Sequence, residues 1–327
     1  MKKLAYGLGI VVLAIGLILG ITSYFMAHFA LTPNPHGVED LARTGQKADS
    51  LQAGSVAWYD SLKTLGVLKD HWITGEDGFK LHACSVPAAN PAEAQGTAIV
   101  VHGYRDSHYV FVYLVRMYRE VFNYNVLFPD LQYHGYSEGN EIQMGWKDRL
   151  DVIRWIDVAH NLFQDDFMVL HGVSMGAATV MMTSGEQLPG FVRCFVEDCG
   201  YSSVYGVFSK ELREMSPLLP KVILRGASLV SRLKFGWSFS EADCRKALAK
   251  CEKPMLFIHG EADDFIPISH LWENYNAKTQ GYKEYWTVPE TGHARSYVNY
   301  PEEYTRRVSN FLNTVHNMIE DGSINDK

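Results

Sequence analysis

The sequence predicts an α/β fold, in which a mainly parallel sheet carries helices on both faces, and three observations support this prediction. Four short apolar segments have the composition of buried parallel strands; they lie near residues 98, 125, 167 and 192. Segments of helical composition alternate with these strands, at 110–120, 145–162 and 177–187. The length of 327 residues and the 47% apolar content are sufficient for one large core.

The first element of the chain is an uncharged, mainly apolar segment at 4–26 that follows Lys2-Lys3. As a helix it is long enough to cross a hydrocarbon core of about 30 Å, and it exceeds the usual apolar region of a signal peptide. We expect a retained single-pass transmembrane anchor at 1–30, with a cleaved signal as the alternative. The lysines place the rest of the chain on the extracytoplasmic side of the cytoplasmic membrane. Gly16 and Gly20 would permit a weak homodimer.

Two smaller elements precede the predicted parallel sheet. Residues 31–69 form a juxtamembrane segment, in which Pro33-Asn-Pro35 breaks the first helix. Apolar residues at helical spacing between positions 38 and 65 indicate helices that pack against the domain at 70–327. Residues 71–86 are typical of a hairpin turning at Asp77-Gly78, which would form the antiparallel edge of the sheet.

A strand, a Gly-x-Ser-x-Gly sequence and a helical segment follow one another from residue 167. This order predicts a sharp turn with Ser174 at its tip, since Gly172 and Gly176 leave room where a β-carbon would collide with neighbouring backbone. The helix that begins near Met175 would direct free N–H groups and the positive end of its dipole at the seryl oxygen. Ser174 is therefore a predicted nucleophile.

Two later strands end in residues that suit an acid and a base. Asp263 follows the strand that begins at Pro254, and His293 follows the strand that begins at Tyr285. Neutral imidazole is the side chain best suited to accept a seryl proton near pH 7, and a carboxylate would orient it. The chain order Ser174, Asp263, His293 predicts a catalytic triad in which each member lies just beyond a strand.

The strand near residue 98 ends in His102-Gly103-Tyr104 at the same edge of the predicted sheet. This placement would bring the backbone N–H of Tyr104 beside that of Met175. Two such donors are the usual way to stabilise the oxyanion of an acyl-transfer reaction.

These motifs resemble the α/β-hydrolase superfamily over the chain from about His71 to the C-terminal helix. The matching stretches are Gly172–Gly176, His102-Gly103-Tyr104, His259-Gly-Glu-Ala-Asp263 with Ile266-Pro267, and Gly292-His293. Residues 128–139 also resemble the superfamily's Pro-Asp-x-x-Gly-His-Gly-x-Ser-x-Gly loop, although Tyr133 stands where that loop has a small residue. The resemblance implies a membrane-anchored bacterial serine hydrolase, similar to esterases and to prolyl-oligopeptidase or prolyl-aminopeptidase enzymes, that needs no cofactor.

Several residues compete for the predicted roles. Asp264 is adjacent to Asp263, but the spacing Asp-x-x-Ile-Pro favours Asp263. Asp198 follows another strand and is an alternative acid. The other strand-end histidines are expected to support loops or pack in the core; they are His102, His171 and His259.

The region at about 201–250 interrupts the alternation of strands and helices and is expected to form a helical cap over the site. Its apolar segments are Leu218-Leu219, Val222-Ile223-Leu224 and Phe235-Gly-Trp237. They suit an acyl or aromatic group, so a carboxylic ester cleaved through an acyl-enzyme on Ser174 is the first prediction. A serine peptidase acting on small peptides is the alternative, and an inactive binding scaffold is a third hypothesis.

Composition argues against other classes. The formal net charge of −7, with no basic run beyond Lys2-Lys3, gives no footprint for nucleic acid. The 13 histidines show no HExxH or paired metal spacing. The five cysteines are expected to be mostly buried thiols, and a helix across 245–248 would hold Cys244 and Cys251 too far apart for a disulfide.

Overall fold

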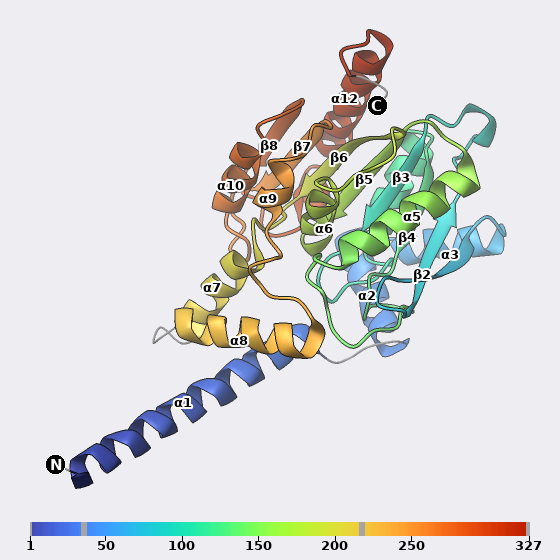
Figure 1. Ribbon diagram of the computed structural model, residues 1–327. Coiled ribbons are helices and arrows are strands. Elements are labelled where there is room, and N and C mark those ends of the chain that lie inside the picture. Colours follow the sequence, from blue (N-terminus) through green and yellow to red (C-terminus); the bar gives the residue numbers. More distant parts are fainter. Residues whose placement is uncertain (1, 34–37, 216–219, 325–327) are drawn as a thin grey trace.

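The computed structural model describes residues 2–33, 38–215 and 220–324, and its centre is an eight-stranded sheet (Figure 1). The strands are β1 (Lys69–Thr74), β2 (Lys80–Val86), β3 (Thr97–Val101), β4 (Asn125–Pro129), β5 (Met168–Val173), β6 (Val192–Asp198), β7 (Met255–Gly260) and β8 (Lys283–Val288). They lie in the order β1-β2-β4-β3-β5-β6-β7-β8. β2 is antiparallel to both neighbours, and β3 to β8 are parallel, as the sequence predicts.

Two hydrophobic cores cover the two faces of this sheet. Side chains alternate along β3, so that Ile99 and Val101 enter one core while Ala98 and Val100 enter the other. The first face carries α5 (Asp148–Phe163), α6 (Met175–Thr183), α9 (Cys244–Leu248) and α10 (Ser269–Ala277). The second carries α2 (Val38–Leu51), α3 (Ser55–Thr64), α4 (Val112–Arg116), the π-helix η2 (Met117–Val121) and α12 (Pro301–Glu320). Short helices η1 (Pro91–Glu93) and α11 (Ser296–Asn299) complete this part.

The predicted helices are present with shifted ends. The helix expected at 110–120 is divided into α4 and η2, and α6 ends at Thr183 rather than at residue 187. A β-carbon at Gly185 would lie only 2.6 Å from the Cα of Ala247 in α9, so the chain turns away where the two segments meet. The predicted hairpin is confirmed as β1 and β2, with Gly78 in a left-handed conformation at its turn.

The N-terminal helix α1 (Lys2–Leu31) projects from the body of the molecule, and within the described part of the chain only its C-terminal turns pack against other elements (Figure 1). It ends one residue beyond the anchor predicted at 1–30 and five beyond the apolar segment that ends at Met26. Ser23 Oγ donates a hydrogen bond to the Ile223 carbonyl, and the Leu31 carbonyl accepts one from the Ile142 N–H. Within the described residues, Tyr6–Leu31 is the one helical segment long and apolar enough to cross a membrane.

Residues 38–65 do not form a separate module, because α2 and α3 pack against the sheet through buried side chains such as Ala48, Tyr59 and Leu62. The predicted break at Pro33-Asn-Pro35 lies partly outside the described residues.

Two helices from the region predicted as a cap lie over the carboxyl edge of the sheet, and we refer to this pair as the cap. They are α7 (Val204–Met215) and α8 (Pro220–Phe235). The region predicted as a cap is wider than this, since α9 packs against α6 in the body. Leu218-Leu219 falls outside the described residues. All five cysteines are buried free thiols, and α9 begins at Cys244, which confirms the prediction made for them.

Candidate active site

Ser174 lies at the tip of a sharp turn between β5 and α6. Its φ of 58° and ψ of −116° are a conformation that non-glycine residues rarely adopt. A β-carbon at Gly172 would lie 2.1 Å from the Gly176 carbonyl oxygen, and one at Gly176 would lie 2.1 Å from the Val101 oxygen. Only glycine fits either position, so the spacing Gly-x-Ser-x-Gly follows directly from the geometry of this turn.

The structure brings Ser174, His293 and Asp263 into one hydrogen-bonded chain. His293 Nδ1 lies 2.7 Å from Asp263 Oδ2, and because a carboxylate only accepts, this nitrogen carries the proton and donates it. The other ring nitrogen, Nε2, is then an acceptor, and it lies 2.9 Å from Ser174 Oγ. The three side chains have the arrangement that lets imidazole remove a seryl proton.

The loop after β7 holds the Asp263 carboxylate in place. Its Oδ1 accepts hydrogen bonds from the N–H groups of Phe265 at 3.0 Å and Ile266 at 2.8 Å, which leaves Oδ2 for His293. His259 Nε2 donates to the Ile266 carbonyl at 2.8 Å, and burial lowers the pKa of this histidine. His259 therefore supports the loop, which explains why the acid occurs within His-Gly-Glu-Ala-Asp followed by Ile-Pro.

The competing residues have other partners or positions. Asp264 is exposed next to the buried Asp263. Asp198 accepts a hydrogen bond from Ser296 Oγ at 2.9 Å, and burial raises its pKa to about 7. His171 lies between the hydroxyl groups of two tyrosines in the core, and burial lowers its pKa to about 3. None of these three side chains is hydrogen-bonded to His293 among the described residues.

The loop after β3 runs beside the turn that carries Ser174. A β-carbon at Gly103 would lie 3.4 Å from the Cβ of Ser174, so glycine permits this approach. The backbone N–H groups of Tyr104 and Met175 donate to no other group within the part of the chain that the structure describes. Both are free to bind an oxygen atom at the carbonyl carbon that Ser174 would attack.

Two buried histidines join the β3 loop to the loop after β4. His102 Nδ1 donates to the Gly103 carbonyl at 2.8 Å, and its Nε2 accepts from the Leu131 N–H at 3.0 Å. His134 Nε2 likewise accepts from the Arg105 N–H at 3.2 Å. Because burial lowers their pKa values, to about 4 and about 3 respectively, both rings are neutral and keep an acceptor.

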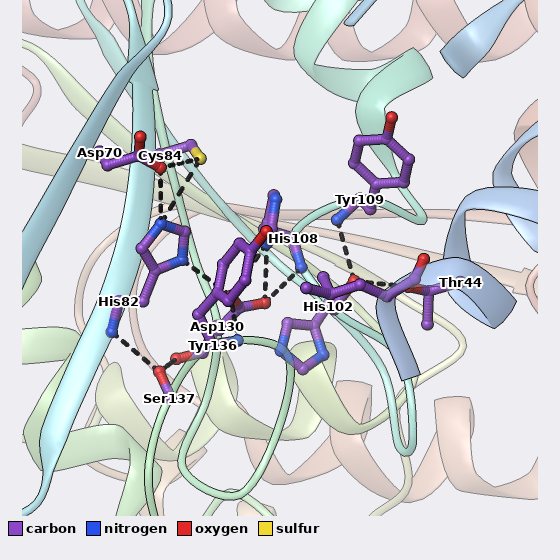
Figure 2. A network of polar contacts seen from close by, with 12 residues as sticks. Thr44, Asp70, His82, Cys84, His102, His108, Tyr109, Asp130, Tyr136 and Ser137 are labelled. Carbon is purple, nitrogen blue, oxygen red and sulfur yellow. Dashed lines mark hydrogen bonds and ion pairs between the residues drawn. The ribbon is translucent and has the colours of Figure 1, made fainter. Parts of the chain in front are cut away.

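A second set of ionisable side chains surrounds Asp130, as Figure 2 shows. Its carboxylate is fully buried and accepts from His82 Nδ1 at 2.8 Å, from His108 Nδ1 at 2.9 Å and from the His108 N–H at 2.8 Å. Burial acts to raise the pKa of Asp130, but the charges and hydrogen bonds of the two histidines hold it well below its usual range. His82 and His108 come from β2 and the β3 loop, so this network fixes the loop that carries Tyr104.

Tyr133 adopts φ 66°, a left-handed conformation that costs a non-glycine residue about 1 kcal/mol or more. This explains the small residue that the superfamily has there. At Gly135 a β-carbon would lie 2.2 Å from the Asp130 carboxyl group, so that glycine is obligatory.

Three groups in the described part of the chain have side chains of metal-ligand type within reach of one another. They are Asp70 with His82 and Cys84, His82 with His108 and Asp130, and Cys199 with Asp263 and His293. In each group the imidazole already bonds a carboxylate. Burial raises the pKa of both thiols well above the usual value, which favours neutral thiol over the thiolate that binds metals. The geometry favours hydrogen-bonded networks over metal centres.

A cavity of about 500 Å³ opens at Ser174. Its walls are mainly apolar and come from the cap, the β7 loop and, unexpectedly, α1. The lining residues contributed by α1 are Thr22, Phe25, Met26, Phe29 and Ala30. Tyr104 also lines the cavity, and its hydroxyl donates to the Ala30 carbonyl at 2.8 Å. Sequence reasoning missed the contribution of α1, since every face of that helix is apolar.

Fold and comparisons together define a serine hydrolase of the α/β-hydrolase superfamily. A family model described as the prolyl oligopeptidase family matches residues 132–318, which is more than half of the chain. The chain belongs to the prolyl oligopeptidase family.

Individual proteins resemble the chain over most of its length. YqkD of Bacillus subtilis (strain 168) is 26% identical over 70% of this chain and 75% of its own. A structure of the esterase Pf2001 of Pyrococcus furiosus is 25% identical, with a TM-score of 0.60, covering 77% of this chain and 95% of that chain. A membrane phospholipase A described as a bacterial virulence factor is 15% identical, with a TM-score of 0.55, covering 97% of this chain and all of that chain. The last likeness shows a shared fold that includes most of α1.

Proposed function

We propose that this serine hydrolase cleaves carboxylic esters through an acyl-enzyme on Ser174. His293 acts as the general base and then as the general acid, and Asp263 fixes the ring with Nδ1 protonated. The N–H groups of Tyr104 and Met175 form the oxyanion hole. The observation that carries the proposal is the chain of two short hydrogen bonds, 2.9 Å and 2.7 Å, that ends on a serine in an apolar cavity.

The geometry supports a two-step reaction. Ser174 Oγ gives its proton to His293 Nε2 and forms a bond to the ester carbonyl carbon, whose oxygen becomes an anion between the two backbone donors. Collapse of this intermediate breaks the bond to the alkoxy oxygen, which takes the proton from the imidazolium and leaves as an alcohol. Water then repeats the sequence on the acyl-enzyme, releasing a carboxylic acid and restoring Ser174.

The cavity favours an ester over a peptide. Of the described residues that line it, only Glu211 is acidic or basic, and the rest are apolar or uncharged. An acyl group is therefore solvated well there, whereas a peptide backbone would leave polar groups without partners. The peptidase alternative is supported by membership of the prolyl oligopeptidase family and by Glu211, whose carboxylate can bind a peptide amine.

Membrane anchoring is part of the proposal. Tyr6–Leu31 has 26 residues, which as a helix measure about 39 Å and exceed a hydrocarbon core of about 30 Å. Lys2-Lys3 favours a cytoplasmic N-terminus and an extracytoplasmic catalytic domain in the cytoplasmic membrane. The positions beside Gly16 and Gly20 are open within the chain, which leaves this face free for the weak homodimer that the sequence suggests.

The test uses the full-length protein in detergent, with short-chain p-nitrophenyl esters and aminoacyl or prolyl p-nitroanilides as matched substrates. We expect ester turnover, and a loss of at least about 10⁴-fold in Ser174→Ala, because the covalent step is removed. Faster turnover of an anilide would replace the esterase by the peptidase, and Glu211→Gln would then raise KM for substrates with a free amine. If wild-type protein fails to react with a fluorophosphonate while Ser174→Ala keeps the same melting curve, the inactive scaffold is correct.

A further inference from the structure

The C-terminal part of α1 forms one wall of the cavity that contains Ser174. The five lining residues from this helix recur at intervals of three and four, from Thr22 to Ala30, and so occupy a single face. Ala30 lies at the inner end, where its carbonyl binds the Tyr104 hydroxyl, and Thr22 lies about 12 Å further along the helix. The cavity thus extends from the reacting serine along the candidate membrane span.

Two residues of this wall face both the cavity and the surroundings of the protein. Phe25 and Phe29 line the cavity, yet they are 63% and 75% exposed. At these two rings the cavity is therefore next to the medium that surrounds α1. The stretch from Tyr6 to Thr22, in which the described side chains other than that of Leu19 are exposed, measures only about 25 Å, which is less than the hydrocarbon thickness of about 30 Å. A bilayer that covers α1 consequently reaches the level of Phe25.

The cap helix α8 has the composition of a helix that lies on a membrane surface. It packs against α1, and Val222, Leu229 and Leu233 form an exposed apolar stripe, since intervals of seven and four return to the same side of a helix. The same helix has four basic residues and no acidic one; the basic residues are Lys221, Arg225, Arg232 and Lys234. All four are exposed, although the whole chain has a net charge of −7. Such a helix fits the interface of a bilayer that contains anionic lipids.

We propose that the substrate is a long-chain acyl ester of a membrane lipid, and that its acyl chain enters the cavity from the bilayer past Phe25 and Phe29. This inference rests on the proposed function, because it assigns the acyl group that Ser174 receives. The released fatty acid can return to the bilayer by the same opening. The anchor is in this view a part of the substrate site and not only a tether.

The first test separates lipid that shares a bilayer with the protein from lipid held in other vesicles. Full-length protein is reconstituted into phosphatidylcholine vesicles that contain phosphatidylglycerol, and a fluorogenic diacyl phospholipid is placed either in the same vesicles or in separate ones. We expect hydrolysis at least about tenfold faster when protein and lipid share a membrane. Equal rates in the two arrangements would overturn entry from the bilayer.

The second test fills the outer end of the cavity. Thr22→Trp places an indole among the lining residues, and we expect the ratio of long-chain to acetyl ester hydrolysis to fall by about tenfold or more. Ile21→Trp is the matched control, because Ile21 is adjacent on α1 and 48% exposed but does not line the cavity. An unchanged ratio in Thr22→Trp, or the same fall in Ile21→Trp, would contradict the proposal.

A third pair of variants tests the surface of α8. Leu233→Asp puts a charge at a side chain that is 79% exposed, and we expect slower hydrolysis of vesicle lipid relative to soluble acetyl ester. Leu65→Asp, at a leucine that is 69% exposed just beyond α3, is the control and should leave this ratio unchanged.

Different experimental results would refute the proposed function and this inference. Absence of any ester hydrolysis by wild-type protein refutes the first, whereas turnover of short esters without turnover of vesicle lipid refutes only the second.

Discussion

Two buried carboxylates in this protein each contact two histidines, and only one of them belongs to the candidate active site. In the Asp263 cluster the carboxylate bonds His293 at 2.7 Å and lies 3.5 Å from His259. In the Asp130 cluster it bonds His82 at 2.8 Å and His108 at 2.9 Å (Figure 2). The two clusters have the same residue types, and in each the carboxylate has one histidine within 2.8 Å.

The clusters differ in what the outer nitrogen of the imidazole meets. His293 has a side chain that is 21% exposed, and its Nε2 faces the hydroxyl of Ser174. The side chains of His82 and His108 are 1% exposed, and their outer nitrogens bond Asp70 at 2.9 Å and the Tyr59 hydroxyl at 3.0 Å. A histidine and an aspartate are thus insufficient for catalysis. The Asp263 cluster also has a strained serine, two free backbone donors and a cavity.

The largest expected effect comes from neutralising the two carboxylates in turn. In Asp263→Asn the amide oxygen keeps the two loop N–H donors, so its NH₂ faces His293 Nδ1 and forces the proton onto Nε2. That tautomer cannot accept the proton of Ser174. We expect kcat for a short ester to fall by about 10³- to 10⁴-fold with little change in the melting temperature. Steady-state kinetics and thermal melts measure both quantities.

The matched substitution in the Asp130 cluster should lower the free energy of unfolding. Asp130→Asn keeps one acceptor oxygen, but it replaces the other by an NH₂ group that faces an imidazole N–H and removes the buried charge between His82 and His108. We expect a loss of about 3 kcal/mol in the free energy of unfolding. The molecules that remain folded keep the triad intact. If Asp130→Asn instead reduced kcat as strongly as Asp263→Asn without loss of stability, the distinction between the clusters would be wrong.

The sequence predicted the Asp263 cluster and missed the Asp130 cluster for a physical reason. The turn at Ser174 needs glycines at fixed offsets, and the acid and base follow strands that a parallel sheet brings to one edge, so local patterns are sufficient. His82 and His108 occupy a strand interior and a loop, where nothing local distinguishes them from other histidines. The sequence did not predict the cavity wall formed by α1 either. An apolar residue that faces lipid and one that faces an acyl chain cannot be distinguished by their sequence pattern.

A smaller effect is expected in the pH dependence of the free energy of unfolding, and it comes from the buried His102 of the β3 loop. Burial lowers the pKa of His102 from 6.5 to about 4, so the folded state binds fewer protons than the unfolded state between these values. The stability that the neutral His102 ring contributes to the folded state is therefore complete above pH 6.5 and is lost as the pH falls toward 4. His102→Ala should therefore cost on the order of 1 to 3 kcal/mol near neutral pH and clearly less at about pH 5. Urea unfolding at the two pH values measures this difference, and a constant cost would show that His102 is not held neutral.

The smallest effect is expected from the thiol beside each cluster. Cys84 adjoins the Asp130 cluster and Cys199 adjoins the Asp263 cluster, and burial raises the pKa of both thiols well above the usual value. Because the thiolate is the reactive form, iodoacetamide at about pH 8 should label neither residue in native protein and should leave ester hydrolysis unchanged. Mass spectrometry of native and urea-unfolded samples checks this, the unfolded sample being the positive control. Labelling of Cys199 alone, with loss of activity, would show that the Asp263 cluster opens to solvent while the Asp130 cluster stays closed, so that the two differ in motion as well as in what they face.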